Sequence, residues 1–277
     1  MTTTTALRAA ARGSDRDPST VVVNGRLEQS PDPGSLPARA SRGTLLLRDD
    51  SSRGAVTDLA DSVRLLSAVA QSGAHDRVVR VYRPWPTVAL TRRERLMPGF
   101  DAACVAARAR GFEPVVRPTG GRAVAYDPSC LVVDVVDSER SGRGDATSAF
   151  VSIGERFVDA LIEVGVDARL GPVPDEYCPG DYSVNARGAV KLVGTAQRVV
   201  RGARLVSGSL PLGSVDALVE VLTAVNAALD FEWNPATFGS VALEVPDARP
   251  VDVEEAIIES LLLGDAVPAT LVELLRP

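Results

Sequence analysis

The chain has 277 residues, 45% of them hydrophobic, and a net charge of −6. This length suffices for one domain with a substantial core, and the acidic balance argues against broad binding to nucleic acid or an anionic membrane surface. Three scattered cysteines and a single histidine provide neither a disulfide framework nor a metal site. Because no apolar run approaches the roughly 20 residues needed to cross a bilayer, we expect a cytoplasmic protein.

The first 42 residues are rich in Ser, Thr, Pro, Gly, Arg and Asp and show little apolar periodicity. A segment of this composition cannot bury enough apolar surface to offset the chain entropy lost on folding. We therefore predict a flexible tail over 1–42, with a short strand at 21–23, and a folded domain over 43–277.

Apolar residues recur at helical spacing over 56–69, and Gly73 is a typical helix stop. The same reasoning predicts helices over 100–110, 150–164, 215–229 and 253–263, and strands over 77–83, 87–90, 113–117, 122–126 and 131–136. Between 182 and 210, short β-runs interrupted by Arg187-Gly188 and Arg201-Gly202 indicate a meander of hairpins. The irregular mixture predicts an α+β fold of mixed, largely antiparallel sheets flanked by helices, with a helical C-terminal part over 214–277.

Lys191 is the only lysine, and the other 29 of the 30 Lys and Arg residues are arginine. An ammonium is a compact donor, whereas a guanidinium is a planar fork that stays protonated in proteins. Either the environment of position 191 requires an ammonium, or an arginine-biased composition left one lysine by chance.

Cys178 lies in the turn-forming sequence Tyr177-Cys178-Pro179-Gly180, thirteen residues before Lys191. We expect its thiol to be accessible, whereas Cys104 and Cys130 are typical of small buried residues. A thiol reacts as the thiolate, which a nearby ammonium favours. If the intervening hairpin folds back, Cys178 and Lys191 form a nucleophile and its electrostatic helper. The alternative is an exposed loop thiol and a solvated lysine.

A glycine pair, Gly120-Gly121, separates two expected strands within the sequence Thr119-Gly120-Gly121-Arg122-Ala123-Val124. Glycines at such a place let the backbone approach a ligand closely. A tight hairpin explains the pair equally well.

These motifs resemble those of a known superfamily. Residues 119–124 are similar to the S-G-G-x-A-V element of the biotin/lipoate protein ligases, and residues 191–198 to their K-x-x-G-S/T-A-Q-R element. The turn at 177–180 looks like that of the LipL-type octanoyltransferases, and the likeness spans roughly 54–212 with the motifs in family order. Thr119 stands where serine is usual, and Arg122 places a large charge beside the glycines, so the acyl pocket can differ.

The resemblance implies the biotin/lipoate protein ligase catalytic-domain fold and a thioester mechanism. Cys178 takes an octanoyl or lipoyl group from a donor, with Lys191 at the acyl carbonyl, and the lysine of a lipoyl domain then accepts it. The implied donor is the glycine cleavage H protein, the implied acceptor is an E2 subunit of a 2-oxoacid dehydrogenase, and no metal or cofactor is required. The implied substrate-binding residues are Arg117, Thr119, Gly120, Gly121, Ala123, Val124, Gly194, Thr195 and Ala196.

Two other functions are compatible with the sequence. An ATP-dependent lipoate–protein ligase would use Lys191 at an acyl-adenylate, and Cys178 would then be incidental. A non-catalytic relative would only bind lipoyl domains or an acyl ligand. The cysteine turn favours the transferase, because an adenylating ligase needs no thiol. Four arginines near Lys191, at positions 187, 198, 201 and 204, either steer an acidic carrier domain or form an ordinary solvated face.

Overall fold

The computed structural model describes residues 20–23, 26–29, 43–49, 51–139, 145–262 and 264–275. The chain divides into two compact units, Met1–Ala40 and Ser41–Pro277. In the first unit, β1 (Thr20–Val23) pairs antiparallel with β2 (Arg26–Gln29), which confirms the strand predicted at 21–23. The sequence did not predict β2, and the rest of the predicted flexible tail lies outside the described residues.

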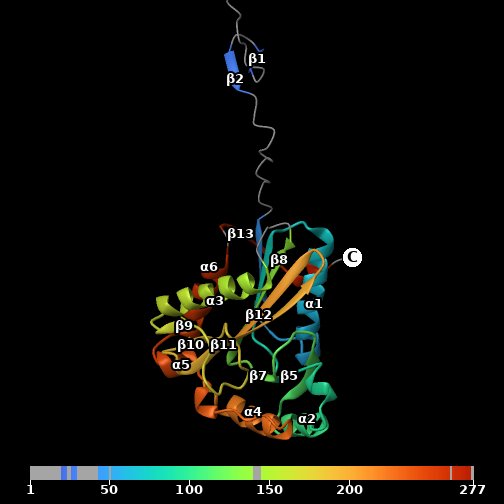
Figure 1. Ribbon diagram of the computed structural model, residues 1–277, viewed down its shortest axis with the longest axis vertical. Helices are drawn as coiled ribbons and strands as arrows, with labels where there is room; N and C mark the ends of the chain where they lie inside the picture. The colour runs from blue at the N-terminus through green and yellow to red at the C-terminus, as the bar shows by residue number, and fades with distance from the viewer. Residues whose placement is uncertain are drawn as a thin grey trace, which may run out of the picture. The chain divides into compact units, whose positions relative to one another are not determined.

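The second unit is built on an eight-stranded sheet of order β13-β3-β4-β8-β12-β11-β10-β9 (Figure 1). Its strands are β3 (Thr44–Asp49), β4 (Arg77–Tyr82), β8 (Cys130–Ser138), β9 (Ala168–Leu170), β10 (Val184–Ala186), β11 (Val190–Val200), β12 (Ala203–Pro211) and β13 (Ala266–Ala269). The pairs β13–β3 and β3–β4 are parallel, and the remaining neighbours in the sheet are antiparallel. The predicted mixed, largely antiparallel sheet is therefore confirmed.

A smaller three-stranded sheet has β5 (Thr87–Thr91) at its centre. On one side β5 pairs parallel with β6 (Glu113–Arg117), and on the other it pairs antiparallel with β7 (Val124–Tyr126). The segment 118–123 must therefore pass across the end of β5 to join the two outer strands. The tight-hairpin interpretation of Gly120-Gly121 is wrong, because β6 and β7 are not neighbours.

Five longer helices correspond to the five predicted ones: α1 (Ala55–Ser72), α2 (Phe100–Arg108), α3 (Ala146–Glu163), α4 (Asp216–Ala228) and α6 (Pro250–Leu261). The stop predicted for the first helix is confirmed, because Gly73 adopts a left-handed conformation and its N–H donates to the carbonyl of Val69. Short turns of helix are η1 (Glu94–Leu96), η3 (Pro235–Thr237), α5 (Val241–Glu244) and α7 (Leu271–Leu274).

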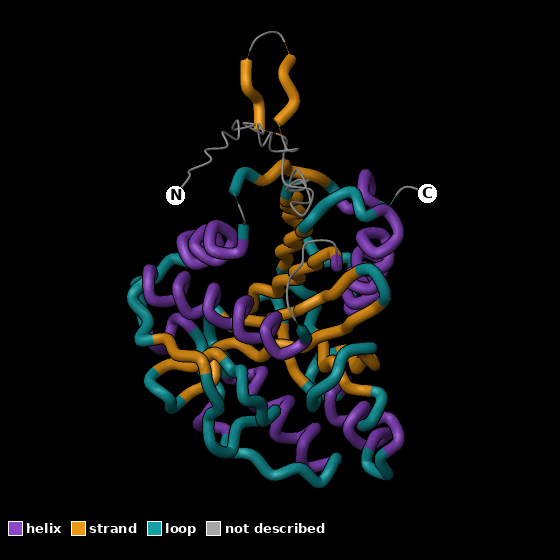
Figure 2. The backbone as a smooth tube through the Cα atoms, turned by 45° about the horizontal axis from the view of Figure 1, so that its top comes forward, coloured by secondary structure: helices purple, strands orange, loops and turns teal. Residues whose placement is uncertain are grey.

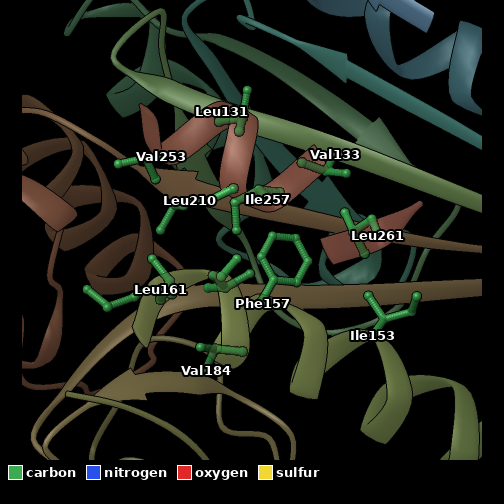
Figure 3. Packing of buried hydrophobic residues seen from close by; sticks show 14 of the residues in the cluster. Leu131, Val133, Ile153, Phe157, Leu161, Val184, Leu210, Val253, Ile257 and Leu261 are labelled. Carbon is green, nitrogen blue, oxygen red and sulfur yellow. The ribbon is translucent and has the colours of Figure 1, made fainter. Parts of the chain in front are cut away.

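Both faces of the large sheet are buried between helices (Figure 2). On one face, α3 and α6 pack against β8 and β12, with Phe157 in the centre of the cluster shown in Figure 3. On the other face, α1 packs against β4 and β8 through Leu65 and Leu66. Residues that alternate along β4, such as Val78 and Val79, therefore enter different cores.

The sequence did not predict the strands β3, β9 and β13. The C-terminal part, expected to be helical, also contributes β13, which runs parallel to β3 at one edge of the sheet. In the described chain no helix is long and apolar enough to cross a membrane.

Candidate active site

Cys178 lies in the turn that follows β9, and its thiol is half-buried. The backbone N–H of Arg122 donates to its Sγ at 3.2 Å. This contact requires the 118–123 segment to come very close: a Cβ on Gly121 would lie 3.2 Å from the sulfur, and Gly121 has a φ of +100°. The backbone at Gly121 therefore approaches the thiol of Cys178 and places a backbone donor on the atom that gains negative charge during thiol chemistry. The predicted approach to a ligand stays a prediction.

Lys191 lies on β11 with only 4% of its surface exposed. Its Nζ donates to the backbone carbonyl of Cys178 at 2.7 Å and lies 4.7 Å from the centre of the Tyr177 ring. The hairpin of β10 and β11 therefore brings the lysine back to the cysteine turn as predicted, and the alternative of a solvated lysine is wrong. The hydrogen bond that Lys191 makes with this turn is accepted by the backbone carbonyl of Cys178 and not by its thiol.

Glu176 is a functional candidate that the sequence did not indicate. This fully buried carboxylate accepts hydrogen bonds from the N–H of Gly180 at 2.9 Å and the hydroxyl of Ser183 at 2.8 Å. Its Oε1 also lies 3.3 Å from the Nζ of Lys191. Glu176 thus stabilises the cysteine turn through Gly180 and Ser183, and its charge offsets that of the buried Lys191 ammonium. In the sequence, an acidic residue in a Pro/Gly-rich turn is typical of an exposed position. The ion pair of Glu176 with Lys191 is evident only in the tertiary structure.

Gly194 explains the spacing of the motif that begins at Lys191. A Cβ at position 194 would lie 2.7 Å from the hydroxyl of Tyr177 and 3.2 Å from the Cε of Lys191. The absence of a side chain three residues after the lysine is what allows both groups to fit on the sheet.

A cavity on the α1 face of the sheet extends from the cysteine turn to β8 and β4. Its lining includes the side chains of Leu59 and Val63 from α1, Val132 from β8 and Leu205 from β12. Of the residues predicted to bind substrate, Arg117, Thr119, Val124, Gly194 and Thr195 line this cavity together with Cys178 and Lys191.

A second, more open cavity meets the first at Cys178, Lys191 and Thr195. The predicted residues Gly120, Gly121 and Ala196 line this second cavity. Ala123 lines neither cavity: it is fully buried, and its N–H donates to the Oε1 of Glu94 at 2.6 Å. Ala123 therefore anchors the segment 118–123 instead of facing a substrate.

Two charged side chains hold the 118–123 segment in place. The Oε2 of Glu94 accepts from the N–H and hydroxyl of Thr91 at the end of β5, while its Oε1 holds Ala123. From the other side, the Nη2 of Arg117 donates to the carbonyls of Gly120 and Arg122. Arg117 thus shapes the segment as well as lining the cavity.

The other two cysteines are buried, as predicted. Burial raises the pKa of Cys130 to about 12 and also raises the pKa of Cys104 above its usual value. Neither thiol lines the two cavities. Cys178 is therefore the nucleophile candidate among the three.

The four arginines predicted to steer a partner differ in their surroundings. Arg187 forms a bidentate ion pair with Glu244, with N–O distances of 2.8 and 2.9 Å. Arg198 donates to the backbone carbonyl of Pro118. Arg201 is exposed in the turn between β11 and β12, and Arg204 is half-buried on β12. Charge steering by this region stays a prediction.

A model of the lipoyl protein ligase A/B catalytic domain matches residues 58–257, and the chain belongs to this family. It is 31% identical over 203 residues to the octanoyl-[GcvH]:protein N-octanoyltransferase of Exiguobacterium sibiricum, covering 70% of this chain and 72% of that protein. It is also 35% identical over 117 residues to the lipoyl-[GcvH]:protein N-lipoyltransferase of Listeria monocytogenes, covering 40% of each.

Among solved structures, a lipoate-protein ligase A bound with ATP superimposes with a TM-score of 0.63 at 23% identity. The match covers 84% of this chain and 93% of that one. This likeness confirms the predicted ligase-type fold and shows nothing beyond the fold.

Proposed function

We propose that this protein is an acyltransferase that moves an octanoyl or lipoyl group between lipoyl-domain proteins through a thioester on Cys178. The observation that carries the proposal is the placement of this thiol where two cavities meet, with a backbone N–H on its sulfur and a buried ammonium on its own carbonyl. The relatives named octanoyl-[GcvH]:protein N-octanoyltransferase and lipoyl-[GcvH]:protein N-lipoyltransferase support this reaction. We propose the glycine cleavage H protein as the donor and an E2 subunit of a 2-oxoacid dehydrogenase as the acceptor.

In the first step, the sulfur of Cys178 attacks the carbonyl carbon of the acyl group, which is held as an amide on the donor lysine. The C–S bond forms, the C–N bond breaks, and the proton of the thiol passes to the departing nitrogen, which leaves as an amine. The acyl chain lies in the first cavity, against the apolar side chains on α1, β8 and β12. The polar side chains of Ser62, Asp134 and Ser207 also line these walls.

Lys191 stabilises the oxygen of the reacting carbonyl in this proposal. An ammonium has three N–H donors, and the contacts with the carbonyl of Cys178 and with Glu176 occupy two of them. We assign the third donor to the acyl oxygen. Because Glu176 and the turn hold the ammonium in place before reaction, little reorganisation is needed when charge develops.

The proposal requires neither ATP nor a metal, because the amide or thioester of the donor already carries the acyl group in transferable form. It also places the protein in the cytoplasm, since a nucleophilic thiol must remain reduced.

The test is intact-protein mass after incubation with octanoylated H protein in the absence of ATP. Wild-type protein should gain one octanoyl group on Cys178 and lose it when an E2 lipoyl domain is added. The Cys178→Ala variant should neither acquire nor transfer the group, while Cys130→Ala should do both. An ATP requirement together with full activity in Cys178→Ala would establish a ligase instead.

A further inference from the structure

The second cavity has a composition different from the first. Two aromatic rings form one of its walls: Phe150 from α3 and Tyr182 from the segment after the cysteine turn are stacked, with ring centres 5.8 Å apart and planes within 4°. Both residues are half-buried, so part of this wall faces the cavity.

The same cavity also contains hydrogen-bond acceptors without partners. The exposed carboxylate of Asp181 makes no hydrogen bond or ion pair with any residue in the described ranges. The Oε1 atom of Gln197 is buried in the cavity lining and has no hydrogen-bond partner among the same residues. A ligand that brings a positively charged donor and a slender apolar stem would meet the carboxylate of Asp181 and cover the aromatic wall.

We propose that this second cavity binds the lysyl side chain of the lipoyl domain, and that Phe150, Asp181 and Tyr182 position its amine for attack on the acyl-enzyme. This inference rests on the proposed thioester function. A lysyl side chain has an alkyl stem that packs on aromatic rings and an ammonium head that is attracted to carboxylates and ring faces. Lys191 also borders the cavity, but its charge is offset by Glu176.

The location agrees with what the second half of the reaction requires. With the acyl chain in the first cavity, the carbonyl carbon on Cys178 is open to attack from the side of the second cavity. The lysine, after losing a proton to solvent, forms the new C–N bond as the C–S bond breaks. The sulfur leaves with the electron pair and takes the second proton of the nitrogen, so the products are the acylated lysine and a free thiol.

By the same geometry, the lysine of a protein donor leaves through the second cavity in the first half of the reaction. A small thioester donor carries no lysine and does not need this cavity. The two kinds of donor therefore separate binding of the lysyl arm from chemistry at the sulfur.

The experiment compares Phe150→Ala, Tyr182→Ala and Asp181→Asn with wild type in two single-turnover measurements. The first is acylation of Cys178 by octanoyl-N-acetylcysteamine, and the second is transfer from the acyl-enzyme to an E2 lipoyl domain. We expect the first rate to be unchanged and the second to fall roughly tenfold for each aromatic variant, and by less for Asp181→Asn. Transfer to free n-butylamine, which mimics the arm alone, should fall in parallel with transfer to the domain.

Two matched controls accompany these variants. Ile162→Ala removes an exposed side chain, 54% accessible, from the same helix as Phe150, and Val199→Ala removes a side chain, 51% accessible, that borders neither cavity; both should transfer normally. Unchanged transfer in all three test variants would overturn the assignment. So would slowed transfer to the domain with normal transfer to n-butylamine, because that pattern indicates docking of the whole domain. If wild-type Cys178 is never acylated, the proposed function itself fails.

Discussion

Arg80 and Lys191 are both buried cations on the same sheet, and their surroundings differ. Arg80, on β4, is fully buried and spreads its contacts over three acceptors: the carboxylates of Asp49 and Asp134 at 2.8 and 3.4 Å and the carbonyl of Asp58 at 3.1 Å. Its guanidinium also lies 4.0 Å from the centre of the Tyr82 ring. A planar fork suits a site in which several fixed acceptors surround one cation.

Lys191 has a single carboxylate partner and a backbone carbonyl, and its ammonium borders both cavities. The comparison indicates that Arg80 joins the sheet to α1, whereas the single lysine lies where a compact donor fits between two cavities.

The largest effect is expected on stability. Arg80→Ala leaves Asp134 buried without its cation, and losing one member of a buried pair costs about 3–5 kcal/mol. Urea denaturation followed by circular dichroism should show a loss of that size. The folded fraction should still acylate Cys178, because Arg80 does not line either cavity. A stable Arg80→Ala protein would contradict the structural role.

Lys191→Arg should lower the acyl-transfer rate by about 10²–10³, the usual cost of losing one preorganised electrostatic contact. A planar guanidinium differs in shape and donor geometry from the compact ammonium that lies between Tyr177 and Gly194, and it cannot take its place. The measurement is single-turnover acylation by a small thioester. Wild-type turnover in Lys191→Arg would show that the single lysine is an accident of composition.

A smaller effect on the acylation rate is expected at the glycine pair, where Gly121→Ala and Gly120→Ala can be compared. Gly121→Ala adds a Cβ at 3.2 Å from the Cys178 sulfur at a positive φ, which should slow acylation roughly tenfold through about 1–3 kcal/mol of backbone strain. At Gly120 a Cβ meets nothing within 4 Å, so Gly120→Ala should remain close to wild type. Equal effects of the two substitutions would remove the argument for close approach at Gly121.

The smallest effect concerns the cysteines. At pH 8 a thiol with a pKa of about 12 is thiolate in only about one molecule in ten thousand, so Cys130 should alkylate very slowly. Its alkylation rate should rise about tenfold with each pH unit up to that pKa, while Cys178 reacts first because it is accessible. Peptide mass mapping after brief iodoacetamide treatment distinguishes the sites. In urea, all three cysteines should alkylate at similar rates.

The features of the fold and the site that depend on neighbouring residues in the chain could be predicted from the sequence. The turn residues around Cys178, the glycine at the end of α1 and the periodicity of the longer helices all act over a few residues, and the structure agrees with them. The return of Lys191 to the cysteine turn also followed from a local signal, the Arg187-Gly188 turn between β10 and β11.

The remaining features depend on contacts between distant segments. Nothing near Glu176 in the sequence indicates that a lysine fifteen residues later will offset its charge. The strand β3 is a short apolar run whose length does not separate strand from helix, and its parallel neighbour β13 comes more than 200 residues later. Ala123 is buried and lines neither cavity, because a motif match identifies a segment, whereas the direction of each side chain depends on its neighbours.

The position of β8 also affects how the chain can reach its folded state. All nine residues of β8 are buried, and the strand lies between β4, which precedes it, and β12, which begins about 65 residues after it ends. During synthesis, the side of β8 that pairs with β12 therefore stays open until Ala203–Pro211 has emerged. An open edge of this apolar character invites pairing with other chains. Premature termination between positions 139 and 202 should therefore yield an aggregating fragment, and the cavity that spans β8 and β12 forms only after this interval has been made.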